Sequence, residues 1–255
     1  MSDLTPQQLK DESRRAARAV DSMRRAAHAD PAQLPSLINA LKRLARLRSD
    51  QGEHHRAASL YLEALNHVTE CEDQLGRGEV AALAANLAYH YDRAETWDPA
   101  AKYYRRALEA IGSADPDPPE LAAVIHNNLA MILRRQGSYE SAEAYYKLAL
   151  KEFIGLNGER HHTVASVYNN YGACCYAARD LKRAREFHEK ALDIRSALYP
   201  NGHPDVAQSC QNLAAVFDTL NQPDKAADLR RQGESMAGTG KRTKATDATG
   251  LLRGS

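Results

Sequence analysis

The stretch NNLAMILRRQGSYESAEAYYKLAL, residues 127–150, returns in altered form as NNYGACCYAARDLKRAREFHEKAL, residues 169–192. The two stretches begin 42 residues apart and have the same length, and both place a small residue fourth and an alanine sixteenth. Repetition at a fixed period indicates a repeat architecture, in which each copy is one supersecondary unit. The period of 42 residues therefore decides the fold class.

Two columns of small residues keep this period over five copies. The first column contains Ala45, Ala88, Ala130, Gly172 and Ala214, and the second contains Ala57, Ala100, Ala142, Ala184 and Ala226. Four residues after the second column comes a bulky one: Tyr61, Tyr104, Tyr146 and His188, with Arg230 in the last copy. Small residues allow two helix backbones to cross closely, and large side chains fill the gaps beside them. The columns predict two antiparallel helices per copy, with a turn at Gly137 in the third, and hence an all-α solenoid.

These columns resemble the tetratricopeptide repeat (TPR). The stretch 127–150 and the string NGHPDVAQSCQNLA, residues 201–214, are similar to the longer repeats of kinesin light chains. The resemblance covers residues 38–231 and implies a right-handed superhelical solenoid of about five helix-turn-helix repeats with a concave and a convex side. Arg43 departs from the asparagine of later copies, and no long heptad coiled coil precedes the repeats, so a motor subunit is not expected.

The sequence predicts three segments. Residues 1–37 form an N-terminal capping helix and linker, residues 38–232 form the TPR domain with five repeats of period about 42, and residues 233–255 form a disordered tail without periodicity. Within the first segment, residues 7–28 form a charged amphipathic helix that Pro31 ends. Trp97 takes the place that Tyr139 holds in the next copy and is expected in the core.

Composition disfavours several classes of function. Lys and Arg total 34 against 33 for Asp and Glu, so no overall field gathers nucleic acid or an anionic membrane. No segment approaches the roughly 20 apolar residues of a membrane span, and the first residues lack the apolar stretch of a signal peptide. Cys71, Cys174, Cys175 and Cys210 form no C-x-x-C pair, which favours buried thiols in a reducing cytoplasm.

Enzyme chemistry is not expected. No acid–base pair, phosphate-binding loop or nucleophile motif stands out, and no cofactor or metal is predicted. His161 and His203 occupy equivalent loop positions, which favours loop packing over metal ligation.

Asparagines recur on the first helix of the copies. Asn128 has counterparts in Asn86, Asn170 and Asn212, and Asn127 has a counterpart in Asn169. An asparagine side chain both donates and accepts hydrogen bonds, so a row of them can pair with the backbone of an extended chain. This row resembles the asparagine ladder in the TPR domain of O-GlcNAc transferases, which implies peptide binding. The alternative is that each asparagine bonds to the neighbouring helix and joins the repeats, and both interpretations stay open.

Cations and larger side chains complete the predicted site. Residues three or four apart share a helix face, so a basic set is expected on or near the same wall: Lys42, Arg43, Arg46, Arg93, Arg134 and Arg135. Guanidinium groups suit carboxylates, which favours an acidic peptide or helix as the ligand. Tyr89, Met131 and Tyr176 are candidates for lining pockets.

The predicted function is a cytoplasmic protein-interaction module that binds a partner segment in the concave groove, as adaptor, co-chaperone or regulator. A self-assembling scaffold is the alternative, and RNA binding by the arginines is a weaker one that predicts a steep salt dependence. No membrane partner is expected, and the oligomeric state stays open.

Overall fold

The computed structural model describes residues 5–70, 76–112 and 119–237. Within these ranges the chain is all-α, with eleven α-helices, one short 3-10 helix and no strand, which confirms the predicted fold class. None of the helices in these ranges is long and apolar enough to cross a membrane. The chain divides into two compact units between Leu121 and Ala122, and each is described by itself.

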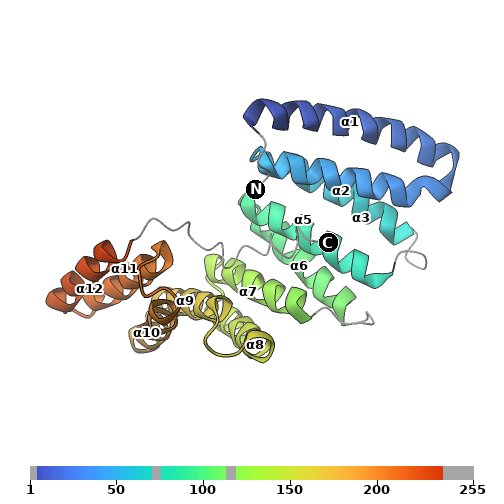
Figure 1. Ribbon diagram of the computed structural model, residues 1–255. Coiled ribbons are helices and arrows are strands. Elements are labelled where there is room, and N and C mark those ends of the chain that lie inside the picture. The colour runs from blue at the N-terminus through green and yellow to red at the C-terminus, as the bar shows by residue number, and fades with distance from the viewer. Residues whose placement is uncertain (1–4, 71–75, 113–118, 238–255) are drawn as a thin grey trace. The chain divides into compact units, whose positions relative to one another are not determined.

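Unit 1 consists of helices that pack in chain order. Their bounds are α1 Pro6–Ala29, η1 Pro31–Gln33, α2 Leu34–Asp50, α3 His54–Glu70, α5 Arg77–Arg93 and α6 Trp97–Ile111. Helix α1 lies along α2, α2 pairs with α3, and α5 packs against both α3 and α6 (Figure 1). The repeat hairpins of this unit are therefore α2–α3 and α5–α6, with α1 covering the outer side of the first.

The N-terminal helix α1 has a defined start and end. Thr5 and Gln8 form a capping box, with the Gln8 amide donating to Thr5 Oγ1 at 3.3 Å and the Thr5 amide donating to Gln8 Oε1 at 2.9 Å. Pro31 follows the helix end at Ala29, as the sequence predicted. Val20 is 1% exposed and fixes the apolar side of the helix.

Unit 2 continues the same scheme. Its helices are α7 Pro119–Arg135, α8 Tyr139–Asn157, α9 His162–Ala177, α10 Leu181–Leu198, α11 Pro204–Thr219 and α12 Pro223–Ser235, with the first residues of α7 assigned to unit 1. Helix α9 packs against α8 and α10, and α11 packs against α10 and α12. Consecutive hairpins thus bury their faces on one another, as a repeat protein requires.

The columns of small residues form the helix crossings. Every alanine of the two columns is 0% exposed. The bulky column is buried as well, with Tyr61 and His188 at 2% and Tyr104 and Tyr146 at 0%. Gly172 stands where other copies have alanine because an added Cβ would lie 2.9 Å from the His188 ring. The fourth copy therefore exchanges an alanine–tyrosine pair for a glycine–histidine pair at the same crossing.

All five hairpins turn in the same way. The turn residue has a positive φ between 56° and 77° in each: Gly52, Glu95, Gly137, Arg179 and Asn221. The next backbone amide donates to a carbonyl five residues earlier at 2.9 Å in every hairpin, for example from Ser138 to Leu133. This is the Schellman arrangement, which favours glycine at the left-handed position. Glu95 and Arg179 adopt that conformation without glycine's freedom.

Three expectations differ from the structure or are refined by it. Trp97 is 37% exposed, so the prediction that it lies in the core was wrong. It is the first residue of α6, at the end of a hairpin, where fewer neighbouring helices surround a side chain. Helix α12 extends to Ser235 and Gly233 is buried in it, so the expected tail from residue 233 begins as helix. Cys71 and the tail beyond residue 237 lie outside the described residues.

Candidate partner-binding face

The predicted asparagines of unit 2 lie together on one face of α7, α9 and α11. We call this the amide face, and its residues are Asn127, Asn128, Met131, Asn169, Asn170 and Asn212. Asn170 Nδ2 donates to Asn127 Oδ1 at 3.2 Å, and Asn212 Nδ2 donates to Asn169 Oδ1 at 2.8 Å. Each bond joins residues 43 apart and links the first helices of neighbouring repeats. These two bonds agree with the interpretation that the asparagines join neighbouring repeats.

The bonds leave some hydrogen-bonding capacity unused. Asn127, Asn128 and Asn169 are buried, at 2%, 6% and 7% exposure. Asn170 and Asn212 are half-buried, and neither side-chain oxygen accepts a hydrogen bond among the described residues. Asn212 also keeps a second N–H, since only one bond from its Nδ2 is formed. The side-chain oxygens of Asn170 and Asn212 and one N–H of Asn212 are therefore without a bond among the described residues.

Side chains next to these amides extend the face. Met131 Sδ lies 3.5 Å from Asn170 Nδ2 and 3.7 Å from Asn127 Nδ2, so the thioether sits between the two amides. Tyr176 and Thr219 share a hydrogen bond of 2.8 Å between their hydroxyl oxygens, again over 43 residues. The face is thus built from side chains that bridge one repeat to the next.

The predicted site residues of unit 1 lie in different surroundings. Asn86 is 8% exposed and its Nδ2 donates to the Ala82 carbonyl at 2.8 Å, within its own helix α5. Tyr89 is 9% exposed, with its ring centroid 5.1 Å from that of His90 and 6.5 Å from that of His54. Tyr89 therefore packs against histidine rings rather than lining an open pocket.

Two of the predicted cations already bind carboxylates. Arg43 Nη2 lies 2.7 Å from Glu12 Oε1 of α1, and Lys42 Nζ lies 2.8 Å from Glu79 Oε1 of α5. The other predicted cations differ in exposure: Arg93 and Arg135 are exposed, and Arg46 and Arg134 are half-buried. An acidic ligand at α2 has to compete with Glu12 and Glu79. Arg134 and Arg135 are the last two residues of α7, after Met131.

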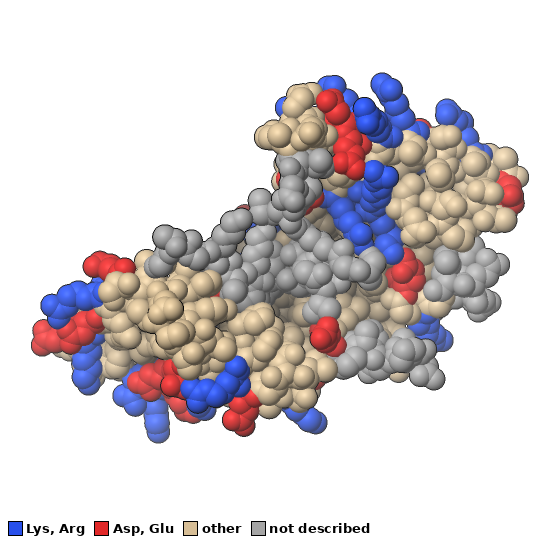
Figure 2. All heavy atoms as spheres, in the orientation of Figure 1, with Lys and Arg blue, Asp and Glu red and all other residues tan. Residues whose placement is uncertain are grey.

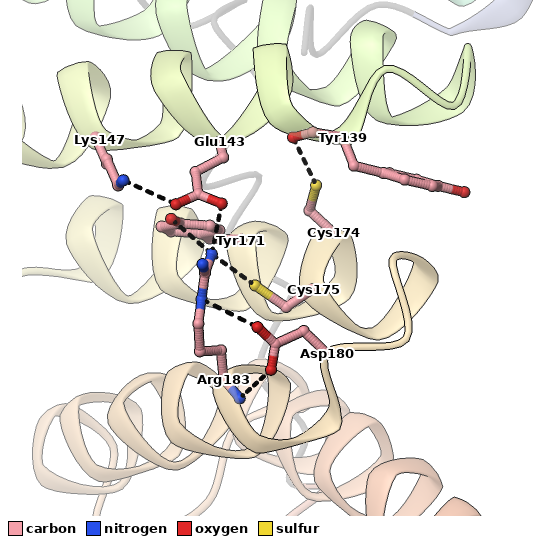
Figure 3. Close-up of polar contacts among 8 residues, drawn as sticks. All are labelled: Tyr139, Glu143, Lys147, Tyr171, Cys174, Cys175, Asp180 and Arg183. Atoms are coloured by element: carbon pink, nitrogen blue, oxygen red, sulfur yellow. Dashed lines mark hydrogen bonds and ion pairs between the residues drawn. The ribbon is translucent and has the colours of Figure 1, made fainter.

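A polar cluster that the sequence did not reveal joins α8, α9 and α10 (Figure 3). Arg183 Nη2 donates to Glu143 Oε2 at 2.7 Å, to Tyr171 Oη at 3.1 Å and to Cys175 Sγ at 3.5 Å. Asp180 caps α10 by accepting from the Arg183 amide at 3.1 Å. One guanidinium thus links three helices. The sequence does not reveal this cluster, because its members lie up to 40 residues apart along the chain.

The pKa values in this cluster are shifted by the Arg183 guanidinium and by burial. The hydrogen bond from Arg183 lowers the pKa of Glu143 from 4.5 to about 2. Burial raises the pKa of the Cys174 thiol to about 11, and burial also raises the pKa of Cys175. Both thiols therefore stay protonated near neutral pH, which makes them poor nucleophiles.

The loop histidines act as helix caps. His161 Nδ1 accepts from the Thr163 amide at 3.4 Å, and His203 Nδ1 accepts from the Asp205 amide at 3.1 Å. Among the described residues no group of three or more histidine, cysteine, aspartate or glutamate side chains is placed to hold a metal ion.

An open pocket of about 580 Å³ lies beside the α9–α10 hairpin, and none of the predicted site residues is in its lining. Its lining is Glu159, Arg160, Tyr168, Glu189, Lys190, Asp193 and Ile194. Charges of both signs alternate there, and Arg160 already pairs with Asp193 at 3.3 Å.

Comparisons with known proteins agree with the architecture. Residues 40–75 and residues 121–197 each match the tetratricopeptide repeat family. No curated protein matches the chain by sequence. The crystal structure of BtubC (BKLC) from P. vanneervenii is 34% identical, has a TM-score of 0.74, and the match covers 92% of this chain and 96% of that chain.

Two further solved structures share the fold at lower identity. A protein of kinesin light chain type from Podosopora anserina, with nearly identical TPR-like repeats, is 16% identical with a TM-score of 0.66, and the match covers 82% of this chain and 99% of that one. The apo form of RapI is 20% identical with a TM-score of 0.67, over 78% of this chain and 69% of that one. The repeat columns, the hairpins and the 34% identity over nearly the full length lead to one conclusion. The chain belongs to the tetratricopeptide repeat family, in the variety found in kinesin light chains.

Proposed function

We propose that this TPR protein binds an extended segment of a partner protein along the amide face of unit 2, as an adaptor, co-chaperone or regulator in the cytoplasm. The TPR fold is a protein-interaction module that takes protein or peptide partners. The observation that carries the finer proposal is the unused hydrogen-bonding capacity of Asn170 and Asn212, which are half-buried on the same face. Their free carbonyl oxygens suit the backbone N–H groups of an extended chain.

The proposed ligand has an acidic side chain near the α7 end of the face. Arg134 and Arg135 end α7, one turn beyond Met131, and guanidinium groups bind carboxylates with two parallel hydrogen bonds. Met131 supplies an apolar contact between the amides. Three amide hydrogen bonds at about 0.5–1.5 kcal/mol each give weak binding once ordering costs are subtracted, so the arginines and Met131 have to contribute.

A pair of double variants tests whether the amides bind a partner or only join repeats. Asn170→Ala with Asn212→Ala removes both inter-repeat hydrogen bonds and the unused ligand-binding groups. Asn127→Ala with Asn169→Ala removes the same two inter-repeat bonds but keeps Asn170 and Asn212 in place. Each variant and the wild type are used to capture partners from native cytosol, after circular dichroism has shown equal helicity.

The proposal expects a captured protein that the first double variant loses and the second retains. Equal loss by both variants means that the asparagines act only by joining repeats. If both variants retain every captured protein, the amide face is not the binding site and the proposal fails.

Self-assembly is a second candidate function, favoured by one observation. Gln211 holds in α11 the position of Asn127 in α7 and Asn169 in α9, and it is exposed with no hydrogen bond among the described residues. Its amide is therefore open to an asparagine of another copy. Light scattering over a hundredfold range of concentration tests this, since a mass that rises with concentration and falls back in Gln211→Ala supports assembly, and a constant monomer mass excludes it.

A further inference from the structure

We infer that α1 carries a second interaction surface, a basic crest that docks an acidic helical segment of a partner protein. The crest consists of Lys10, Arg14, Arg15, Arg18 and Arg25, all of them exposed. It belongs to unit 1 and goes beyond the amide face proposed for unit 2. Figure 2 shows Lys and Arg side chains along the edge that α1 occupies in Figure 1.

The crest is the side of α1 that faces away from α2. The buried residues of the helix are Ser13, Ala16, Val20 and Ala27, and they face the opposite direction at 3.6 residues per turn. Lys10, Arg14 and Arg18 follow each other at intervals of four residues, which is about 6 Å along the axis per step. Arg25 lies within about 20° of both Arg14 and Arg18 around the helix, so the crest is a band about 22 Å long on the outward side of α1.

Ion pairs neutralise the positive charge of the crest only in part. Arg14 lies 3.7 Å from Asp11, whereas Lys10, Arg15, Arg18 and Arg25 have no acidic partner among the described residues. The other two acids of α1 pair with cations outside the crest: Asp21 binds Arg24 at 2.9 Å, and Glu12 binds Arg43 of α2 at 2.7 Å. Arg24 also binds Glu63 of α3 at 2.7 Å.

On helix α10 in unit 2, by contrast, exposed cations pair with acids of the same helix. There Arg185 pairs with Glu189 at 3.5 Å and Lys190 pairs with Glu186 at 2.8 Å, both four residues apart. Exposed cations on that helix are matched by acids one turn away, which keeps the surface neutral and soluble. Among the described residues the five crest cations form a single ion pair, Arg14 with Asp11, although the whole chain has a net charge of only +1.

Protein carboxylates fit the crest better than a bilayer or nucleic acid does. The apolar side of α1 is buried against α2, with Val20 1% exposed, so the helix has no apolar face to insert into a membrane. The near-zero net charge supplies no field that gathers a polyanion. Four of the five cations are arginines, which bind carboxylates through two parallel hydrogen bonds. Acids four residues apart on a partner helix also recur about every 6 Å and match the row.

The test uses the full chain and a synthetic 20-residue helical peptide with glutamate at every fourth position. A second peptide of the same composition spreads the glutamates around the helix. Fluorescence anisotropy at low salt measures binding to the wild type, to Arg14→Gln/Arg18→Gln/Arg25→Gln, and to the control Lys102→Gln/Arg105→Gln/Arg106→Gln on α6. Both triple variants lose three positive charges, so only the position of the charge differs between them.

We expect the crest variant to bind the first peptide about tenfold more weakly, and the α6 control to bind it within about twofold of wild type. Asp11→Asn leaves the crest cations in place, removes one acid, and is expected to raise affinity about twofold. Equal affinity of both triple variants, or of both peptides, overturns the proposal. Tighter binding of duplex RNA or of phosphatidylserine vesicles than of the peptide also overturns the proposal, because the crest then prefers phosphate groups to carboxylates.

Discussion

The ion pair between Glu143 and Arg183 should contribute to the free energy of unfolding of unit 2. The fall in the pKa of Glu143 from 4.5 to about 2 corresponds to at most about 3 kcal/mol of stability above pH 4.5. The Glu143 side chain is 26% exposed and that of Arg183 is 37% exposed, so solvent screens the pair. We therefore expect Glu143→Gln to destabilise unit 2 by about 1–2 kcal/mol at pH 7.

The difference in unfolding free energy between wild type and Glu143→Gln should depend on pH. Because the folded-state pKa is depressed, the stabilisation is fully present above pH 4.5 and is lost as the pH falls toward about 2. The gap between wild type and Glu143→Gln should therefore shrink between pH 4.5 and pH 2.5. Once the carboxyl is protonated, it and the glutamine amide are both neutral beside Arg183.

Hydrogen exchange measured by mass spectrometry is the suitable assay, because peptides from α8, α9 and α10 report the local opening free energy of these helices. Exposed Glu159, which forms no ion pair among the described residues, provides the control Glu159→Gln, for which we expect no difference at any pH. Two results would refute the electrostatic explanation of this cluster. One is a difference in opening free energy between wild type and Glu143→Gln that is the same at pH 7 and pH 2.5, and the other is no difference at pH 7.

Three further predictions concern the repeat geometry. Gly172→Ala should destabilise the chain by about 1–3 kcal/mol, because the new Cβ lies 2.9 Å from the His188 ring. In a His188→Ala background the same change should cost almost nothing, and an additive double-mutant cycle in urea would contradict this contact. Arg179→Gly should stabilise by about 0.5–1 kcal/mol, since φ is 64° there, and a lower urea midpoint would show that the side chain contributes more than the backbone strain costs. Asn212→Leu should destabilise by about 1 kcal/mol through loss of its bond to Asn169, and an unchanged thermal midpoint would show that this bond contributes little.

The proposed functions divide between the two units. The amide face combines bonds between repeats with a few free groups, so its role in binding depends on the ligand matching the two acceptors that remain at Asn170 and Asn212. The basic crest depends on charge and is sensitive to salt. Measuring each surface with its own variants keeps the two proposals separate.

Several features were predictable because they depend on close packing. The alanine columns predicted where helices cross, and these alanines are fully buried. Gly137 predicted the turn, because its φ of 77° is one that glycine adopts readily. The capping helix was predicted over residues 7–28 and lies at Pro6–Ala29, since an apolar stripe and a following proline mark its course and end.

Other features could not be predicted, because they depend on side-chain partners. Tyr89 and Trp97 are both large aromatic residues, yet Tyr89 is 9% exposed between histidines and Trp97 is 37% exposed at a helix end. Arg183 looks in the sequence like any surface cation, but it binds groups on α8 and α9. Exposure and partner choice of this kind depend on how neighbouring helices are placed.

By itself the sequence determined the all-α class, the helix pairs and the sites of closest packing, since a period of 42 residues can persist only where every copy meets the same steric demand. Tertiary structure alone decided what the asparagines do. Their bonds join residues 43 apart, one more than the period, because a side chain reaches across to a different position on the preceding helix. A column compares equivalent residues in different copies, whereas a hydrogen bond joins non-equivalent ones, and only the packing of one repeat on the next sets that offset.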